Sequence, residues 1–243
     1  MKNRKLVVNV ITNFVLVAVV FCVTCISFYG GVRNVFVSND KTQPYYKGNV
    51  GIRAVSLMIN VYWGTEYIDS MLEILDRYDV KATFFVGGDW ASKNSDKLWA
   101  IAERGHEIGN HGYFHKDHAK LSYQQNVDEI LACEKVVEAT CGVKTILFAP
   151  PSGSYNKATL SASSSLGYKT IMWSKDTIDW RDKNSQLIFT RATTNLSNGD
   201  LVLMHPTKDT VLALPKIIEC YIEKGFNIVV VSQNILGENN AIL

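Results

Sequence analysis

The sequence lacks a strong excess of charge of either sign. It has 25 Lys and Arg residues against 23 Asp and Glu residues, a formal net charge of +2. Part of this small excess belongs to an N-terminal cluster, Lys2, Arg4 and Lys5. A nucleic-acid-binding surface needs a concentrated basic patch. We therefore expect no nucleic acid among the partners of this chain.

Charged residues are also missing from Leu6 to Gly31, and the run from Phe14 to Phe28 is almost entirely apolar. This stretch has the length and polarity of a membrane-spanning helix. Because basic residues precede it, the positive-inside rule leaves the N-terminus in the cytoplasm and the rest of the chain outside. No small-x-small cleavage site follows, which favours an uncleaved anchor over a cleaved signal peptide. We predict a single-pass cell-membrane protein with its domain on the extracytoplasmic side.

The cysteines show no metal-binding spacing. Cys22 and Cys25 lie in the apolar run, while Cys133, Cys141 and Cys220 form an odd-numbered set further along the chain. Without paired spacing, buried reduced thiols are the simplest interpretation of the later three.

Three regions follow from composition. Residues 1–31 form the basic start and anchor, and residues 32–50, which contain turn-forming residues and no sustained period, form a stem. In residues 51–243, short β-branched or aromatic runs alternate with stretches long enough for helices. This alternation predicts βα units and a parallel sheet, and we expect an α/β fold, a distorted (β/α)7-type barrel.

The expected strands and helices are defined by residue ranges. The strand-like runs are 54–61, 82–86, 107–110, 145–148, 169–173, 201–205 and 227–231. The expected helices are 67–78, 90–104, 123–139, 157–166, 186–196 and 210–224.

Polar residues cluster where these strands end, which is the face that carries catalytic residues in such barrels. His111 and His115 have the i, i+4 spacing that allows two imidazoles to share a metal ion. Taken alone, this spacing is more often two surface or hydrogen-bonded histidines. His106 lies at the start of a strand, away from that face, and is expected to be structural. His118 is expected to be exposed to solvent.

Five segments in order resemble motifs of the polysaccharide deacetylases, carbohydrate esterase family 4, which share the NodB-homology domain. The resemblance covers about residues 52–236. The segments are VKATFFVGGDW (80–90), GHEIGNHGYFH (105–115), LFAPPSGSYN (147–156), WSKDTIDW (173–180) and LVLMHP (201–206). The resemblance implies a divalent metal ion, usually zinc, and hydrolysis of the N-acetyl group of an amino sugar.

The resemblance also implies roles for individual residues. The metal ligands would be His111 and His115, and His205 would be the general acid, tuned by Asp179. The groove residues that would contact the sugar are Pro151, Tyr155, Trp180 and Trp63.

Three departures concern the chemistry itself. Where the family has a base aspartate and a metal-binding aspartate after the first strand, the residues assigned to those positions are Asn60 and Val61. Ala149 stands where the family has the arginine that steadies the base. We therefore expect zinc to be weakly bound or absent, and we expect Val61→Asp to tighten its binding.

Two functions remain open. The first is a deacetylase-like hydrolase that acts on N-acetyl groups of cell-wall glycan, peptidoglycan or chitin-like, with metal-assisted amide hydrolysis. The second is a catalytically impaired pseudoenzyme that binds the same glycan without hydrolysis. The variant motifs closely resemble those of a sporulation-associated subgroup of these deacetylase-like proteins in endospore-forming bacteria. This resemblance implies an established variant of the family pattern and leaves both functions open.

Overall fold

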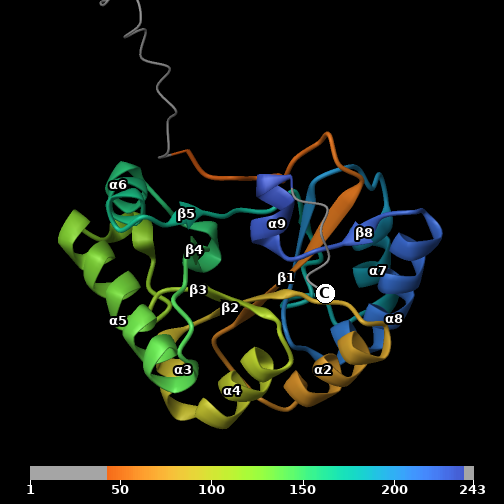
Figure 1. Cartoon of the computed structure of the whole chain (residues 1–243), viewed down its shortest axis with the longest axis horizontal. Coiled ribbons are helices and arrows are strands. Elements are labelled where there is room, and N and C mark those ends of the chain that lie inside the picture. The colour runs from red at the N-terminus through yellow and green to blue at the C-terminus, as the bar shows by residue number, and fades with distance from the viewer. Residues whose placement is uncertain (1–42, 238–243) are drawn as a thin grey trace, which may run out of the picture. The chain divides into compact units, whose positions relative to one another are not determined.

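The computed structural model describes residues 43–237, which belong to one compact unit (Figure 1). The predicted anchor over residues 6–30, together with Cys22 and Cys25, lies outside the described residues. Within residues 43–237, no helix combines the length and apolar character needed to cross a membrane.

The domain is built on a parallel sheet, as the alternation of elements predicts. The pairing order is β5-β4-β3-β2-β1-β7-β6, and β8 pairs with β1 off this path. The strands are β1 (Ala54–Val61), β2 (Thr83–Val86), β3 (Glu107–Asn110), β4 (Leu147–Phe148), β5 (Lys169–Thr170), β6 (Lys175–Asp176), β7 (Asp200–Met204) and β8 (Asn227–Ile228). This arrangement confirms the expected α/β barrel-type fold.

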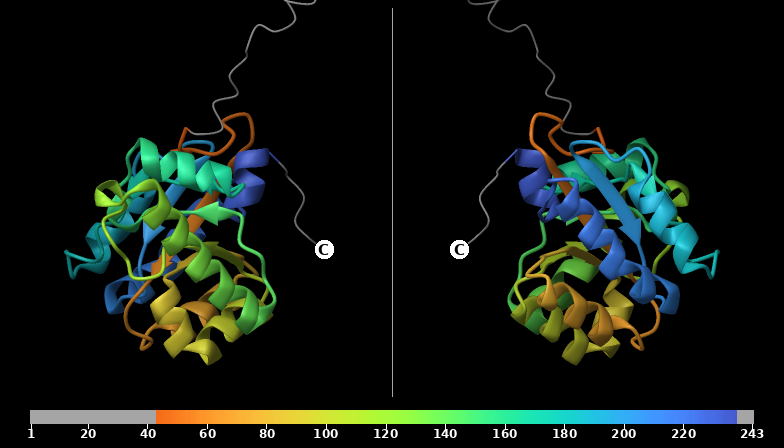
Figure 2. Two further views of the ribbon diagram at one scale, coloured as in Figure 1. Left: turned by 90° about the vertical axis from the view of Figure 1, so that its left-hand side faces the viewer. Right: turned by 90° about the vertical axis from the view of Figure 1, so that its right-hand side faces the viewer.

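Helices surround the strands (Figures 1 and 2). They are α2 (Ile68–Arg77), α3 (Gly88–Lys93), α4 (Ser95–Glu103), α5 (Tyr123–Cys141), α6 (Lys157–Ser165), α7 (Ser185–Thr193), α8 (Lys208–Glu223) and α9 (Val231–Leu236), with 3-10 turns η1 (His118–Lys120) and η2 (Pro151–Gly153). The sequence predicts one helix over 90–104, but α3 ends at Lys93, where the Asn94 side chain donates a hydrogen bond to the Trp90 carbonyl. Two shorter helices result.

Strand β1 separates two apolar cores. Successive side chains of a strand point to opposite faces. Ile59 and Val61 therefore pack with the surrounding helices in the outer core, whereas Met58 packs with Phe85 inside the sheet. Asn60 follows Met58 on the inner face. This alternation decides which residues after β1 reach the functional site.

Helix α9 covers the end of the sheet where the strands begin. Val231 donates its backbone N–H to Thr83 Oγ1 of β2, and the Asn234 side chain donates to Ser56 Oγ of β1. The preceding chain joins this end, since the Asn49 N–H donates to the Asn234 carbonyl. The described part of the expected stem therefore packs on the domain, and the opposite end of the sheet is left for a site.

The three later cysteines are free thiols. Cys133 is fully buried, and Cys141 and Cys220 are partly buried. Burial raises the pKa of the Cys133 thiol to about 12, which keeps it protonated and unreactive. Buried reduced thiols are what the sequence predicts.

Candidate functional site

His111 directly follows β3 and is fully buried. Its Nδ1 lies 2.7 Å from the Ala149 carbonyl oxygen and must therefore carry the proton that it donates. That tautomer leaves a lone pair on Nε2, which is buried without a hydrogen-bond partner among the described residues. Burial holds the pKa of His111 well below its usual range. His111 thus presents a neutral nitrogen suited to a ligand.

His115 lies beside His111, with ring centroids 5.1 Å apart. Its backbone has a φ of 54°, in the left-handed region, so the turn must be held by its surroundings. Glu129 of α5 supplies that support, because one carboxylate oxygen accepts the backbone N–H groups of Tyr113 and Phe114. Burial lowers the pKa of His115 to about 4. The two predicted histidines are therefore brought together.

Tyr62, and not Val61, faces these histidines. The Tyr62 ring stacks on the His115 imidazole with centroids 3.5 Å apart and lies 5.9 Å from the His111 ring. Val61 is fully buried in the outer core on the opposite face of β1. The prediction that residue 61 stands in the metal-ligand position is therefore wrong, since side chains alternate along β1. Because every second side chain lies on the same face, Tyr62 is the next residue after Asn60 that faces the pocket.

His205 follows β7 and is fixed by Asp179. Its Nδ1 lies 2.7 Å from Asp179 Oδ1, and its backbone N–H donates to Asp179 Oδ2 at 2.6 Å. The Thr210 hydroxyl donates to the same Oδ2 at 2.6 Å. With Nδ1 protonated and bound, Nε2 is the nitrogen available for proton transfer. The predicted His205–Asp179 pair is present.

These groups share one pocket of about 330 Å³ at the carboxyl ends of the strands. Its lining residues are Asn60, Tyr62, His111, His115, Ser152, Trp173, Asp176, Trp180, Leu203 and His205. Asn60 Oδ1 is buried without a partner among residues 43–237, so it is an unsatisfied acceptor in the pocket wall. Tyr62, Trp173 and Asp176 belong to this lining although their sequence context predicts no role for them.

The predicted sugar-contacting residues are divided. Trp180 lines the pocket and is 56% exposed, so its ring is open to a ligand. Trp63 borders the pocket, with its ring 5.2 Å from that of His205. Pro151 is buried and does not line the pocket. The Tyr155 hydroxyl is hydrogen-bonded to that of Tyr46, and Tyr155 also lies outside the pocket lining.

Two further histidines lie outside the pocket. His106 is buried at the start of β3, where its Nδ1 accepts the Ala82 N–H, in agreement with its predicted structural role. His118 is also fully buried, and its Nδ1 donates to Asn126 Oδ1. The prediction that His118 is exposed is wrong, because its ring is held by Asn126 of α5 and its carbonyl accepts a hydrogen bond from the Thr159 hydroxyl of α6.

The pocket offers an incomplete set of metal ligands. His111 Nε2 is oriented as a ligand, but within residues 43–237 no three His, Cys, Asp or Glu side chains are placed to hold one ion. Structural and catalytic zinc sites use at least three protein ligands. Tyr62 occupies the space against His115, and its neutral phenol does not replace a carboxylate. The residues present therefore do not fit the metal site that the family resemblance implies.

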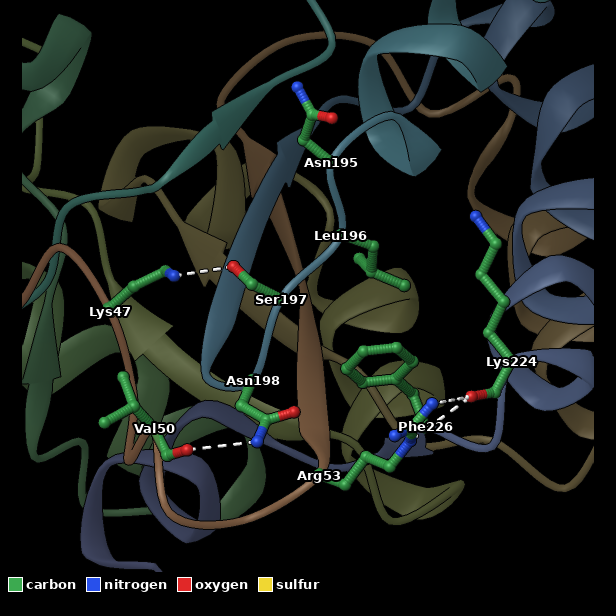
Figure 3. Close-up of a pocket in the computed structure, with 9 residues that line it drawn as sticks. All are labelled: Lys47, Val50, Arg53, Asn195, Leu196, Ser197, Asn198, Lys224 and Phe226. Atoms are coloured by element: carbon green, nitrogen blue, oxygen red, sulfur yellow. Dashed lines mark hydrogen bonds between the residues drawn. The ribbon is translucent and has the colours of Figure 1, made fainter.

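A second, larger hollow of about 750 Å³ lies where strands begin (Figure 3). Its charged lining residues are Lys47, Arg53 and Lys224. Arg53 donates two hydrogen bonds to the Lys224 carbonyl and lies over the Phe226 ring. No histidine or carboxylate lines this hollow, so it has no acid–base pair.

Sequence comparison identifies the family. A family model described as polysaccharide deacetylase matches residues 47–171. The protein YlxY of Bacillus subtilis is 40% identical over 193 residues, a match that covers 79% of this chain and 60% of that relative's length. The chain belongs to the polysaccharide deacetylase family. A peptidoglycan-N-acetylglucosamine deacetylase of Bacillus cereus is 32% identical, with 69% of this chain and 81% of the relative covered.

Solved structures of this family share the fold. The wild-type form of a CE4 family pseudoenzyme from Bacillus anthracis superposes with a TM-score of 0.78 at 36% identity, and the match covers 80% of this chain and 69% of the other. A mutant form has the same TM-score at 35% identity, and that match covers 80% of this chain and 71% of the other. A peptidoglycan N-acetylglucosamine deacetylase has a TM-score of 0.76 at 28% identity, covering 79% of this chain and 92% of the other. The polysaccharide deacetylase family thus includes both an enzyme and a pseudoenzyme with this architecture.

Proposed function

We propose that this polysaccharide deacetylase-like domain binds N-acetylated amino sugars of cell-wall glycan and that its hydrolytic activity is impaired. The observation that carries this proposal is the stacking of Tyr62 on His115, in a pocket where no third His, Cys, Asp or Glu side chain among residues 43–237 is placed to share an ion with the two histidines. Asn60 has no carboxylate to take a proton from water. Two Bacillus cereus relatives, both named peptidoglycan-N-acetylglucosamine deacetylase, support the choice of glycan.

The pocket keeps the parts that a sugar-binding site needs. Trp180 and Trp63 expose aromatic faces at its rim, and such faces pack well against the apolar faces of sugar rings. Asn60 Oδ1 and His111 Nε2 are buried acceptors without partners among the described residues, and an acetamido N–H or a hydroxyl group would satisfy them. Binding therefore needs no catalytic base.

A slow deacetylase is the second candidate. It is favoured by the His205–Asp179 pair, whose geometry presents His205 Nε2 to the pocket as a proton donor for a leaving amine. Loss of a general base typically lowers the rate by about 10²- to 10⁴-fold, so the remaining groups are compatible with measurable turnover.

Two measurements on the purified protein separate these functions. Calorimetry with N-acetylglucosamine oligomers reports binding, and acetate release from the same oligomers and from peptidoglycan, with and without added zinc, reports hydrolysis. Binding without acetate release supports impaired catalysis. Acetate release that a chelator removes would select the enzyme, and absence of binding would reject the proposal.

We also propose that the domain acts outside the cytoplasmic membrane, held by the apolar segment near the N-terminus. The basic residues before that segment and the missing cleavage site support this location. Protease accessibility of the domain in intact cells tests it.

A further inference from the structure

Asp176 is a pocket carboxylate that the His205–Asp179 pair does not use. It is the last residue of β6 and pairs in parallel with Leu203 of β7. Because side chains alternate, Leu203 and His205 share one face of the chain, and Asp176, Leu203 and His205 all line the pocket. Neighbouring strands lie about 4.8 Å apart. Asp176 therefore faces the pocket beside His205.

One oxygen of Asp176 is fixed and the other is available. Oδ1 accepts the backbone N–H of Ile178 at 2.8 Å. Ile178 has a φ of 55°, an unfavourable conformation for a β-branched residue, so this turn is held in place by its contacts. Among residues 43–237, Asp176 has no further hydrogen bond or ion pair. Both oxygens of Asp179, by contrast, are fully engaged.

We propose that Asp176 binds the amino group of a de-N-acetylated amino sugar, so that the pocket prefers the free amine to the acetamide. This inference rests on the proposed function. Removal of the acetyl group turns a neutral nitrogen with one N–H donor into an ammonium group with three donors and a positive charge. That nitrogen is the atom next to His205 when His205 acts as proton donor, and Asp176 lies beside it.

Charge explains the expected preference. A hydrogen bond between two charged groups is stronger than one between neutral groups, and a partly buried carboxylate without a cation gains most from such a partner. Burial also raises the pKa of Asp176, because desolvation of its ionised form outweighs the opposing effects of the Ile178 N–H, His205 and Arg191. An acetamide supplies no such charge. The acetylated sugar is therefore expected to gain less from Asp176.

The test uses the purified full chain and two probes, tetramers of glucosamine and of N-acetylglucosamine, at about pH 6, where the amine is protonated. Calorimetry should give the glucosamine tetramer an affinity about tenfold higher, the factor that about 1.4 kcal/mol of a charged hydrogen bond provides. D176N should remove this preference, because it should weaken binding of the glucosamine tetramer about tenfold more than binding of the acetylated tetramer. D96N is the matched control, because it makes the same change on the exposed surface of α4.

Each other result overturns the inference. Equal weakening of both tetramers by D176N would place Asp176 against a hydroxyl group, and equal effects of D176N and D96N would indicate long-range charge alone. If D176N folds poorly, the wild-type protein still decides, because its preference for the free amine must exist and must fall as salt is raised. Binding of neither tetramer would reject the proposed function itself, whereas binding without preference rejects only the role of Asp176.

Discussion

Two consecutive positions at the end of β1 respond in opposite ways to an introduced carboxylate. Val61 lies in the outer core, and Tyr62 lies against His115. The sequence alone predicts that Val61→Asp supplies the missing metal ligand. The structure predicts that Tyr62→Asp does so and that Val61→Asp chiefly destabilises the domain.

The cost of Val61→Asp follows from burial. Val61 is 0% exposed, and loss of its apolar burial costs about 1.5–3 kcal/mol. A carboxylate without a partner in that core adds several kcal/mol, or is protonated at a similar cost. A total of at least about 4 kcal/mol corresponds to a fall in Tm of roughly 8–16 °C for a domain of this size.

The cost of Tyr62→Asp is smaller. The ring is partly exposed, and its stacking on His115 contributes about 0.5–1.5 kcal/mol. The new carboxylate would stand next to two neutral imidazoles and complete the three-ligand set typical of open zinc sites. We expect zinc binding to tighten by about tenfold or more, since about 1.4 kcal/mol is enough for that factor.

Zinc titration by calorimetry and thermal unfolding of both variants check this prediction. Tyr67→Asp is a suitable control, because it introduces the same carboxylate nearby, in front of α2, without lining the pocket. A Val61→Asp protein that keeps its Tm and binds zinc more tightly than Tyr62→Asp would refute the alternation of side chains along β1.

Four other predictions concern separate features. His205→Ala should abolish any acetate release while leaving glycan binding measurable, because only the leaving amine needs its proton. Trp180→Ala should weaken glycan binding in calorimetry by roughly three- to tenfold, whereas Trp99→Ala, a similarly exposed tryptophan on α4, should have no effect. Burial lowers the pKa of His106 from 6.5 to about 4, so between these pH values the unfolded chain binds more protons than the folded chain, and the free energy of unfolding falls as pH drops from 6.5 to about 4. In urea unfolding across this pH range, His106→Asn should reduce the slope of the unfolding free energy against pH by the equivalent of up to about one proton. Sequencing of the mature N-terminus should find residues 6–30 retained, and a start within residues 28–45 would contradict the anchor.

The fold was predictable because its signals are local. The bounds of β1 and β3 agree with the predicted runs at 54–61 and 107–110, and α2 differs by one residue at each end. β6 and α9 were missed, since each is at most six residues long and too short to show a period. Side-chain capping by Asn94 ended α3 inside a stretch whose composition suits one helix.

The site was predictable in its histidines and less so after β1. His111, His115, His205 and Asp179 belong to motifs whose spacing survives in the sequence. Which residue after β1 faces the histidines depends on the alternation of side chains between the two faces of the strand. Aligning Val61 with a family aspartate chose a residue that points to the outer core, whereas its neighbour Tyr62 lines the pocket. Burial of His118 depends on Asn126, eight residues away on another element, and no local pattern reports that contact.

Retention of the His205–Asp179 pair does not by itself demonstrate catalysis, because Asp179 also has a structural task. Its Oδ2 accepts the backbone N–H of His205, which lies before α8, and the hydroxyl of Thr210 in the first turn of that helix. Both donors are buried, and leaving a buried donor unsatisfied costs about 1–3 kcal/mol. Selection for folding alone is sufficient to keep Asp179. Asn60, on the inner face of β1, and Tyr62, directly after the strand, line the pocket and belong to neither apolar core, so the base and metal positions can change without unfolding the domain. A loss of activity in an Asp179 variant is therefore informative only beside the His205→Ala variant, which keeps the carboxylate and its two donors.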